Sequence, residues 1–312
     1  MEPGDPSRAP LLPPGWWGER HLPPQPRSVA GLVGDRVLDA ELAALAWLLV
    51  EAHVPIIVAG PPGSGRTTVL TALLDFLPAE ARMVPLDGAI EDFGWLPEAT
   101  ELGWRHERPV ERRGDALAAA RPPSRASTVL LVTELGAVAR HGTWGPRARI
   151  AVRALALGYA MAATMAARRL EDVLDGLKAP PVRADDDELT RLGLVLVLRV
   201  PDPGVGAAVT PRVTAAHYVR PVVRDAHGHV QRMPPAVLAA HDTTTDRLEH
   251  FAWGIITELA ARTGRTPLEF EREQARRAQY LAGLASAGIT EPEAVRTAIA
   301  GYRGAAGGAI PV

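Results

Sequence analysis

Several residue types are scarce in this 312-residue chain, and each scarcity excludes a class of chemistry. Cysteine is absent, which excludes disulfides, Cys-ligated zinc and thiol nucleophiles. Lysine occurs once, at Lys178, although Lys and Arg together number 34. A site that ordinarily uses a lysine must therefore use Lys178 or an arginine. The formal net charge of -2 argues against a strongly electrostatic nucleic-acid binder, so we expect no specific nucleic-acid partner.

Long apolar runs are also missing. The longest uncharged stretch, Ala154 to Ala167, is too short to span a bilayer. Residues 1–27 contain eight prolines and no apolar signal core, which predicts an extended tail or linker. We therefore expect a cytoplasmic protein that reaches the inner face of a membrane only through a partner.

Strand-like and helix-like segments alternate along the middle of the chain, which predicts an α/β fold with a mostly parallel sheet. Apolar runs typical of buried strands occur at 55–59, 83–86, 128–132, 159–165 and 193–200. Helical periodicity falls around them, at 39–51, 67–77, 147–157 and 169–177.

The pattern changes after Val200. Residues 213–223 and 229–233 flank a turn at 225–228, which predicts a β-hairpin. Three helical stretches follow, at 246–261, 267–286 and 291–302. We therefore expect four parts: a tail over 1–27, a core domain over 28–212, a hairpin with a helical extension over 213–303, and a frayed end over 304–312.

The segment most informative about function is Gly60-Pro61-Pro62-Gly63-Ser64-Gly65-Arg66-Thr67-Thr68. It fits the phosphate-binding pattern G-x-x-x-x-G-[basic]-[ST], with a predicted strand before it and a predicted helix after it. Glycines there let backbone N–H groups face a phosphate, and the helix N-terminus adds a positive dipole. The Thr67 hydroxyl is placed to ligate Mg²⁺. A Gly/Pro-rich turn from strand to helix, without a ligand, is the alternative.

Arginine at position 66 changes what such a loop can do, because the pattern normally has lysine there. Arg66 keeps the positive charge but is longer, planar and bulkier than an ammonium. Nucleotide binding is compatible with that change. Hydrolysis rests on positioning and charge stabilisation, so we expect Arg66 to slow it.

A second element is the apolar run Thr128-Val-Leu-Leu-Val-Thr-Glu134, which ends in a carboxylate. A P-loop ATPase needs a carboxylate at the end of a strand beside its phosphate loop. Glu134 is thus a candidate to polarise the attacking water or to hold Mg²⁺ through water. An ordinary acidic residue at a strand end is the alternative.

These segments together resemble the secretion and pilus-assembly traffic ATPases of the type II/type IV class, particularly their archaeal-type branch. The resemblance covers roughly residues 28–303. Beyond the P-loop, RMVPLD (82–87) with Glu91 is similar to the family's acidic box, and Thr133-Glu134 stands at its Gly-Glu. The departures are arginine for the P-loop lysine, Gly88 within the acidic box, and Tyr159 and Ala166 at two family histidines.

The resemblance implies a RecA-like P-loop core with a C-terminal helical subdomain. It implies ATP and Mg²⁺ as cofactors, and hydrolysis of ATP to ADP and phosphate that drives secretion or pilus machinery. It also implies a homo- or hetero-oligomer, a hexameric ring by resemblance, on the cytoplasmic face of a membrane platform protein. The family carries a separate N-terminal domain; because fewer than about 30 residues precede the core in this sequence, we expect no such domain here.

The resemblance also assigns roles to residues. Gly60 through Thr68 would hold the nucleotide, Thr67 would ligate Mg²⁺, and Arg66 and Glu134 would act in catalysis. Glu91 is a weaker candidate. Arg108, which lies in a basic run, is another weaker candidate. Two interpretations of this run remain open: an arginine that acts on the nucleotide of a neighbouring subunit, or a solvated loop.

Two other functions remain open. A catalytically degenerate pseudo-ATPase, a regulatory or scaffold subunit, would fit the changes at Arg66, Gly88, Tyr159 and Ala166. An unrelated P-loop enzyme such as a small-molecule kinase is the other. Four histidines lie in or near the predicted hairpin: His217, His227, His229 and His241. Two interpretations of them remain open, a metal site or solvated surface residues.

Overall fold

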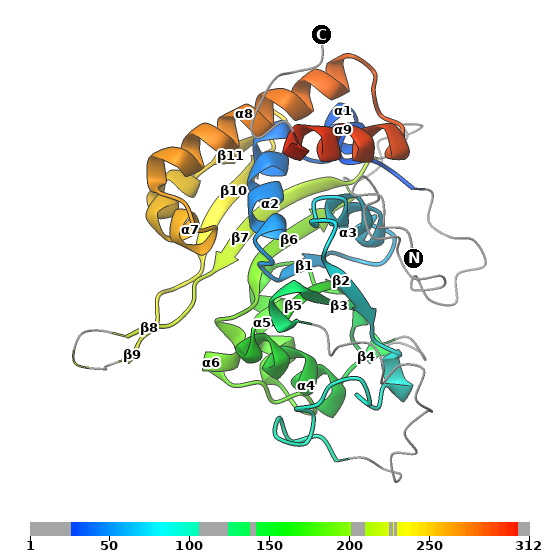
Figure 1. Cartoon of the computed structure of the whole chain (residues 1–312), viewed down its shortest axis with the longest axis vertical. Helices are drawn as coiled ribbons and strands as arrows, with labels where there is room; N and C mark the ends of the chain where they lie inside the picture. The colour runs from blue at the N-terminus through cyan, green and yellow to red at the C-terminus, as the bar shows by residue number, and fades with distance from the viewer. Residues whose placement is uncertain are drawn as a thin grey trace.

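The computed structural model describes residues 26–105, 124–137, 142–200, 210–224, 227 and 230–304. Four predicted features lie outside these residues wholly or in part: residues 1–25 of the predicted tail over 1–27, Arg108, His229, and residues 305–312 of the predicted frayed end. The main sheet contains β1 (Ile56–Ala59), β2 (Arg82–Pro85), β3 (Thr128–Leu135), β4 (Gly142–Thr143), β5 (Ala160–Met165), β6 (Gly193–Arg199), β7 (Arg212–Val219), β10 (Ala236–Asp242) and β11 (Arg247–His250). Their order across the sheet is β11-β10-β7-β6-β1-β5-β3-β2, with β4 beside β3 (Figure 1).

The parallel part of the sheet has the strand order of a RecA-like P-loop core. The strand that precedes the phosphate-binding segment, β1, lies between β5 and β6, and it pairs in parallel with both. One strand further out, β3 carries Glu134 and pairs in parallel with β5 and β2. The predicted α/β fold with a mostly parallel sheet is therefore confirmed. Parallel strands place their carboxyl ends at one edge, where Gly60 and Glu134 both lie.

The C-terminal strands differ from the predicted hairpin. Most of the segment 213–223 forms β7, which pairs antiparallel with β6 and β10 rather than with 229–233. Only a short pair remains of that hairpin, β8 (Val223–Arg224) with β9 (Val230–Gln231), which projects from the body in Figure 1. The sequence does not predict β10, because Ala-rich segments have low strand propensity.

Helices cover both faces of the sheet (Figure 1). One face carries α1 (Val29–Gly34), α2 (Ala40–Glu51), α3 (Arg66–Leu74), α7 (Ile256–Arg262), α8 (Pro267–Ser286) and α9 (Pro292–Gly304). The other carries α4 (Pro146–Ala154), α5 (Leu170–Lys178) and α6 (Asp186–Leu189). Single 3₁₀ turns lie at Gly88–Ile90, Arg125–Ser127, Leu155–Leu157 and Ala252–Ile255. The helix predicted over 246–261 is therefore wrong in its first half, where β11 and a 3₁₀ turn precede α7.

Strand alternation produces the two cores. In β1, Ile56 and Val58 face the α2 side, whereas Ile57 and Ala59 face the α4 side. The same alternation holds in β3, β5 and β6. Because both faces are covered, these strands read as continuous apolar runs rather than as alternating ones.

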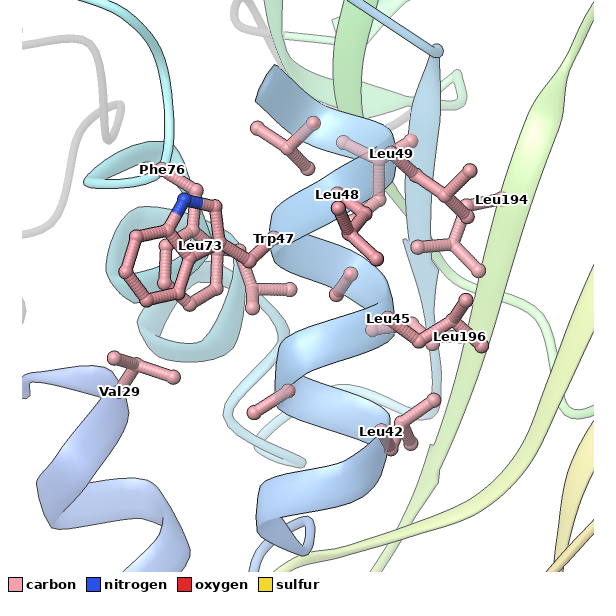
Figure 2. Packing of buried hydrophobic residues seen from close by; sticks show 14 of the residues in the cluster. Val29, Leu42, Leu45, Trp47, Leu48, Leu49, Leu73, Phe76, Leu194 and Leu196 are labelled. Carbon is pink, nitrogen blue, oxygen red and sulfur yellow. The ribbon is translucent and has the colours of Figure 1, made fainter. Parts of the chain in front are cut away.

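The α2 helix is the centre of the larger core. Nine consecutive residues, Leu42–Val50, are buried, because α2 lies between the sheet and α8. Figure 2 shows Leu45 and Leu49 directed toward Leu196 and Leu194 of β6. On the opposite flank of α2, the Trp47 ring stacks on Phe76 just beyond α3, with ring centroids 5.0 Å apart. A helix buried on all sides lacks a polar stripe, which accounts for the weak amphipathic pattern of this segment.

None of the helices in the described ranges is long and apolar enough to cross a membrane.

Candidate functional site

The predicted phosphate-binding segment joins β1 to α3 and has the backbone that its glycines allow. Gly63 has a φ of 81° and Gly65 a φ of 79°, both in the left-handed region that side chains disfavour. Gly65 is the residue immediately before α3, so the backbone turns there and presents the first N–H groups of the helix. This conformation is what an anion site at a helix N-terminus requires.

Gly60 and Ser64 pack against one another within the loop. A Cβ on Gly60 would lie 2.4 Å from Ser64 Oγ and 3.0 Å from the Leu198 carbonyl oxygen, so only glycine fits. The Ser64 backbone N–H donates to the Pro61 carbonyl at 3.2 Å. Ser64 Oγ is buried and has no hydrogen-bond partner among the described residues. An unpaired buried hydroxyl is costly, and it marks this loop as a place for a polar ligand.

The two threonines of the motif lie in the first turn of α3. Thr67 is buried, 6% exposed, and Thr68 is partly exposed. Their carbonyl oxygens both accept from Thr71 Oγ1, at 2.7 and 2.9 Å. These bonds hold the turn that carries the Thr67 hydroxyl.

Arg66 and Glu134 form an ion pair across the carboxyl edge of the sheet. Arg66 Nη1 donates to Glu134 Oε1 at 2.8 Å. The two side chains are only 11% and 16% exposed. Sequence analysis predicts that both residues belong to one site, and the structure brings them into direct contact. In this arrangement the basic and acidic groups of the site neutralise each other.

Thr164, near the end of β5, fixes the other oxygen of Glu134. Thr164 Oγ1 lies 2.9 Å from Glu134 Oε2 and 2.5 Å from the Thr133 carbonyl oxygen. Thr164 is 1% exposed. Both carboxylate oxygens of Glu134 are thus occupied. The sequence analysis gives Thr164 no role, although its place two residues before Ala166, at one of the family histidine positions, is a signal that could have found it.

Glu91, the weaker candidate, is turned into its own loop rather than toward the phosphate loop. Its Oε2 accepts from the Asp87 N–H at 2.9 Å, and its Oε1 accepts from the Phe93 N–H at 2.6 Å and from Trp95 Nε1 at 3.3 Å. Burial raises the pKa of this carboxyl, and the two backbone N–H groups counteract that rise only in part. Glu91 therefore organises the segment after β2.

A further arginine, missed by the sequence analysis, supports that segment. Arg147 Nε donates to the Glu91 carbonyl at 2.8 Å, and its guanidinium lies over the Trp104 ring at 5.2 Å. Gly88, which replaces an acidic-box residue, has a φ of 57° at the start of a 3₁₀ turn. Its left-handed backbone favours glycine. Arg147 on α4 thereby joins this segment to the face opposite α3.

The remaining basic and histidine candidates lie elsewhere. Lys178 pairs with Asp186 at 2.7 Å between exposed ends of α5 and α6, so the chain's lysine does not substitute for Arg66 in this structure. Tyr159, at a family histidine position, is 4% exposed, and burial raises its pKa. Within the described ranges no group of three or more His, Asp or Glu residues could hold a metal ion, so a histidine metal site finds no support there.

The residues present fit a nucleotide phosphate with Mg²⁺. The loop offers left-handed glycines, an unpaired Ser64 hydroxyl and the start of α3, and Thr67 and Glu134 supply the hard oxygen donors that Mg²⁺ prefers. Arg66 Nη1 and Glu134 Oε1 are already paired with each other, so a ligand that takes this donor or this acceptor competes with the ion pair.

No protein-family model matches the chain. It is similar to two uncharacterized proteins of Methanocaldococcus jannaschii. Over 165 residues it is 28% identical to MJ1287, which covers 51% of this chain and 56% of that protein. Over 172 residues it is 24% identical to MJ0900, which covers 55% of this chain and 30% of that protein. The chain thus spans about half the length of one of these relatives and less of the other.

Among solved structures, the chain is similar to the VirB11 ATPase from the Brucella suis type IV secretion system, determined in complex with sulphate. The two are 20% identical, with a TM-score of 0.32 over 53% of this chain and 49% of that one. The RecA-like assignment rests on the strand order of this chain. In that order β5 lies between β1, which precedes the phosphate loop, and β3, which carries Glu134.

Proposed function

We propose that this chain binds ATP with Mg²⁺ at the Gly60–Thr68 loop and hydrolyses it, as an ATPase of the secretion and pilus-assembly type. The observation that carries the proposal is the turn from β1 into α3 through left-handed Gly63 and Gly65, beside a strand that ends in Glu134. The order of the sequence segments, which resembles that of the traffic ATPases, supports the choice of ATPase over other P-loop proteins.

In this proposal the backbone N–H groups at the start of α3 bind the phosphates, and Arg66 supplies positive charge to them. Thr67 and Glu134 hold Mg²⁺, Glu134 through water, and the ion offsets phosphate charge during hydrolysis. Glu134 also orients the attacking water once Arg66 has left it for the phosphate. Thr164 keeps the Glu134 carboxylate directed toward the site through Oε2.

A second candidate is a nucleotide-binding subunit that does not turn ATP over. The Arg66–Glu134 ion pair favours it, because the pair uses the residue that would polarise water. A planar guanidinium also cannot move with a transferred phosphoryl group as a compact ammonium does. In this case the bound nucleotide would set the shape that the chain presents to an active ATPase.

The proposal extends to partners and location. Traffic ATPases work as rings, so we expect this chain to assemble with copies of itself or with a related ATPase. We expect it at the cytoplasmic face of a membrane platform protein. Both expectations come from the resemblance alone.

Calorimetry with ATP and Mg²⁺, together with phosphate release, tests the function. We expect binding by the wild type. We expect Arg66→Lys to raise turnover about 10-fold or more, because lysine releases Glu134 more readily and follows the phosphoryl group. Arg82→Lys, an exposed arginine on β2, is the matched control and should change neither quantity.

Three outcomes separate the candidates. Turnover by the wild type that Glu134→Gln removes supports the ATPase. Binding with no wild-type turnover, and turnover gained by Arg66→Lys, supports the second candidate. No binding at millimolar ATP by either the wild type or Arg66→Lys contradicts both.

Light scattering with ATP and the Glu134→Gln variant tests the assembly. Trapped nucleotide should shift the mass from one chain toward a ring of several chains. A monomer at every protein and nucleotide concentration would contradict an autonomous ring.

A further inference from the structure

A second basic feature lies at the carboxyl edge of the sheet, next to the phosphate loop but with no lining residue from Gly60–Thr68. It is a groove of 660 Å³ whose basic and imidazole side chains come from the segment after β5 and from β6, β7 and β10: Arg168, Arg169, Arg199, Arg212, His217 and His241. We call it the arginine groove. None of the described residues that line it is Asp or Glu. A chain of net charge -2 has therefore gathered four arginines around one hollow.

Sheet geometry explains why these residues meet. Arg199 at the end of β6 and Arg212 at the start of β7 are direct cross-strand partners. His217 lies five residues after Arg212 on β7, beyond a register shift of β7 against β6. Alternation places Leu196, Leu198, Ala216 and Tyr218 in the core under α2, so their alternating neighbours Val197 and His217 face the other side. The groove thus opens on the face that α5 covers, whereas α3 carries the phosphate loop to the opposite face.

The charges of the groove are only partly compensated. Arg169 pairs with the partly exposed Asp172 at 3.0 Å, and Asp246 Oδ1 lies 3.0 Å from His241 Nε2 and 3.7 Å from Arg212 Nε. The Arg168 and Arg199 guanidinium groups make no ion pair or hydrogen bond with any described residue, although both line the groove. Uncompensated cations around one hollow repel each other, and a bound anion removes that repulsion.

Hydroxyl and imidazole groups add hydrogen-bonding capacity. Thr214 and Thr243 line the same hollow. Burial lowers the pKa of His217, and Glu171 raises it only in part, so the unliganded imidazole favours its neutral form. A neutral imidazole can donate to a phosphate oxygen from one nitrogen. The donor set therefore suits an oxyanion with several oxygens.

We propose that the arginine groove is a second ligand site, which takes a small molecule bearing two or more phosphate groups. Arginine recognises phosphate through paired N–H donors, and four arginines exceed what a single carboxylate needs. The volume lies within the range of about 300–1,000 Å³ typical of small-molecule sites. Aspartates flank the groove at 172 and 246, so the basic surface does not continue as the long track that a nucleic-acid backbone would follow.

Calorimetry with inorganic pyrophosphate on the full chain tests the proposal. Arg168→Ala/Arg199→Ala should weaken pyrophosphate binding at this site by about 10-fold or more, since it removes two charged donors. Arg66→Ala should leave this binding event intact, because Arg66 does not line the groove. If the phosphate loop binds no ligand, the wild type and Arg66→Ala should both still bind pyrophosphate at the groove. The variant Arg168→Ala/Arg199→Ala should lose this binding.

The control is Arg191→Ala/Arg272→Ala, which removes the same charge from two exposed arginines that do not line the groove. It should bind pyrophosphate as the wild type does. The single variant Arg199→Gln keeps the test available if the double variant does not fold. Unchanged pyrophosphate binding by the groove variants would overturn the proposal. So would groove-dependent binding of a 20-nucleotide single strand, measured by anisotropy, that is tighter than pyrophosphate binding.

Discussion

At the scale of single residues, one substitution determines the state of the whole site. Arginine at position 66 reaches Glu134, and Thr164 holds the second carboxylate oxygen. The sequence predicts the loop, its glycines and Glu134 as members of one site. It cannot predict their contact, because the contact depends on the reach of the guanidinium and on the register of β3 against β5.

Thr164→Val tests the residue that holds Glu134. Valine keeps the volume but removes the hydroxyl, which leaves Glu134 Oε2 and the Thr133 carbonyl without this donor. We expect the free energy of unfolding to fall by about 1–3 kcal/mol, measured by urea denaturation. Thr164→Ser keeps the hydroxyl and should lose clearly less. Equal stability of the valine and wild-type proteins would show that this hydrogen bond is unimportant.

At the scale of elements, α3 connects the phosphate loop to the C-terminal helices. Just beyond its end, the carbonyl oxygens of Phe76 and Leu77 accept from Arg303 of α9, at 2.6 and 3.2 Å. A cation there also suits the negative end of the α3 dipole. Asp75, at the same end, is buried instead, and burial raises its pKa to about 7 although Arg296 and Arg303 oppose the rise.

Asp75 makes stability depend on pH. Its folded pKa of about 7 exceeds the ordinary aspartate value of 3.8, so the folded state binds the extra proton between these values and loses stability as pH rises through them. Asp75→Asn mimics the protonated acid. We expect it to raise the free energy of unfolding by about 1–3 kcal/mol at pH 8 and to change it little at pH 4. Urea denaturation at both pH values measures this, and an equal effect at both would contradict it.

Prediction of elements from sequence succeeded where one pattern dominated. The α8 helix has the predicted bounds, because Thr266 and Glu269 form a capping box and Pro267 occupies the first turn. The parallel strands were recognisable as apolar runs. β11 escaped detection because a four-residue strand with alternating exposure is indistinguishable from the start of a helix in so short a window.

At the scale of the whole molecule, a buried charge cluster joins elements that are distant in sequence. Glu51 at the end of α2 accepts from Arg277 of α8 at 2.6 Å and from Arg303 of α9 at 2.8 Å. Arg277 also lies 4.6 Å from the centre of the Trp47 ring. Burial alone would raise the pKa of Glu51, but the two arginines outweigh it and hold the pKa below its usual value. The cluster fixes the C-terminal helices on the core.

Glu51→Gln removes the shared anion and leaves two arginines without it. Arg277 is 5% exposed and keeps Glu273 as a partner at 2.7 Å, so its charge stays compensated in part. We expect a loss of about 1.5–3 kcal/mol in the free energy of unfolding, measured by urea denaturation. Glu41→Gln, exposed in the first turn of the same helix, is the control and should cost no more than about 1 kcal/mol. Similar losses in the two variants would contradict a role specific to the cluster.

The Arg66–Glu134 contact also has a consequence for how affinity is measured. If nucleotide binding needs Arg66 to leave Glu134, the loop binds only during the fraction of time that this contact is open. If the contact is closed about 99% of the time, the observed dissociation constant is about 100-fold weaker than that of the open loop. Glu134→Gln, which weakens the contact, should then tighten nucleotide binding while it removes turnover. Under the proposed function, the glutamate competes with the nucleotide for the arginine, and the balance between these two contacts sets the nucleotide concentration at which the loop is half occupied.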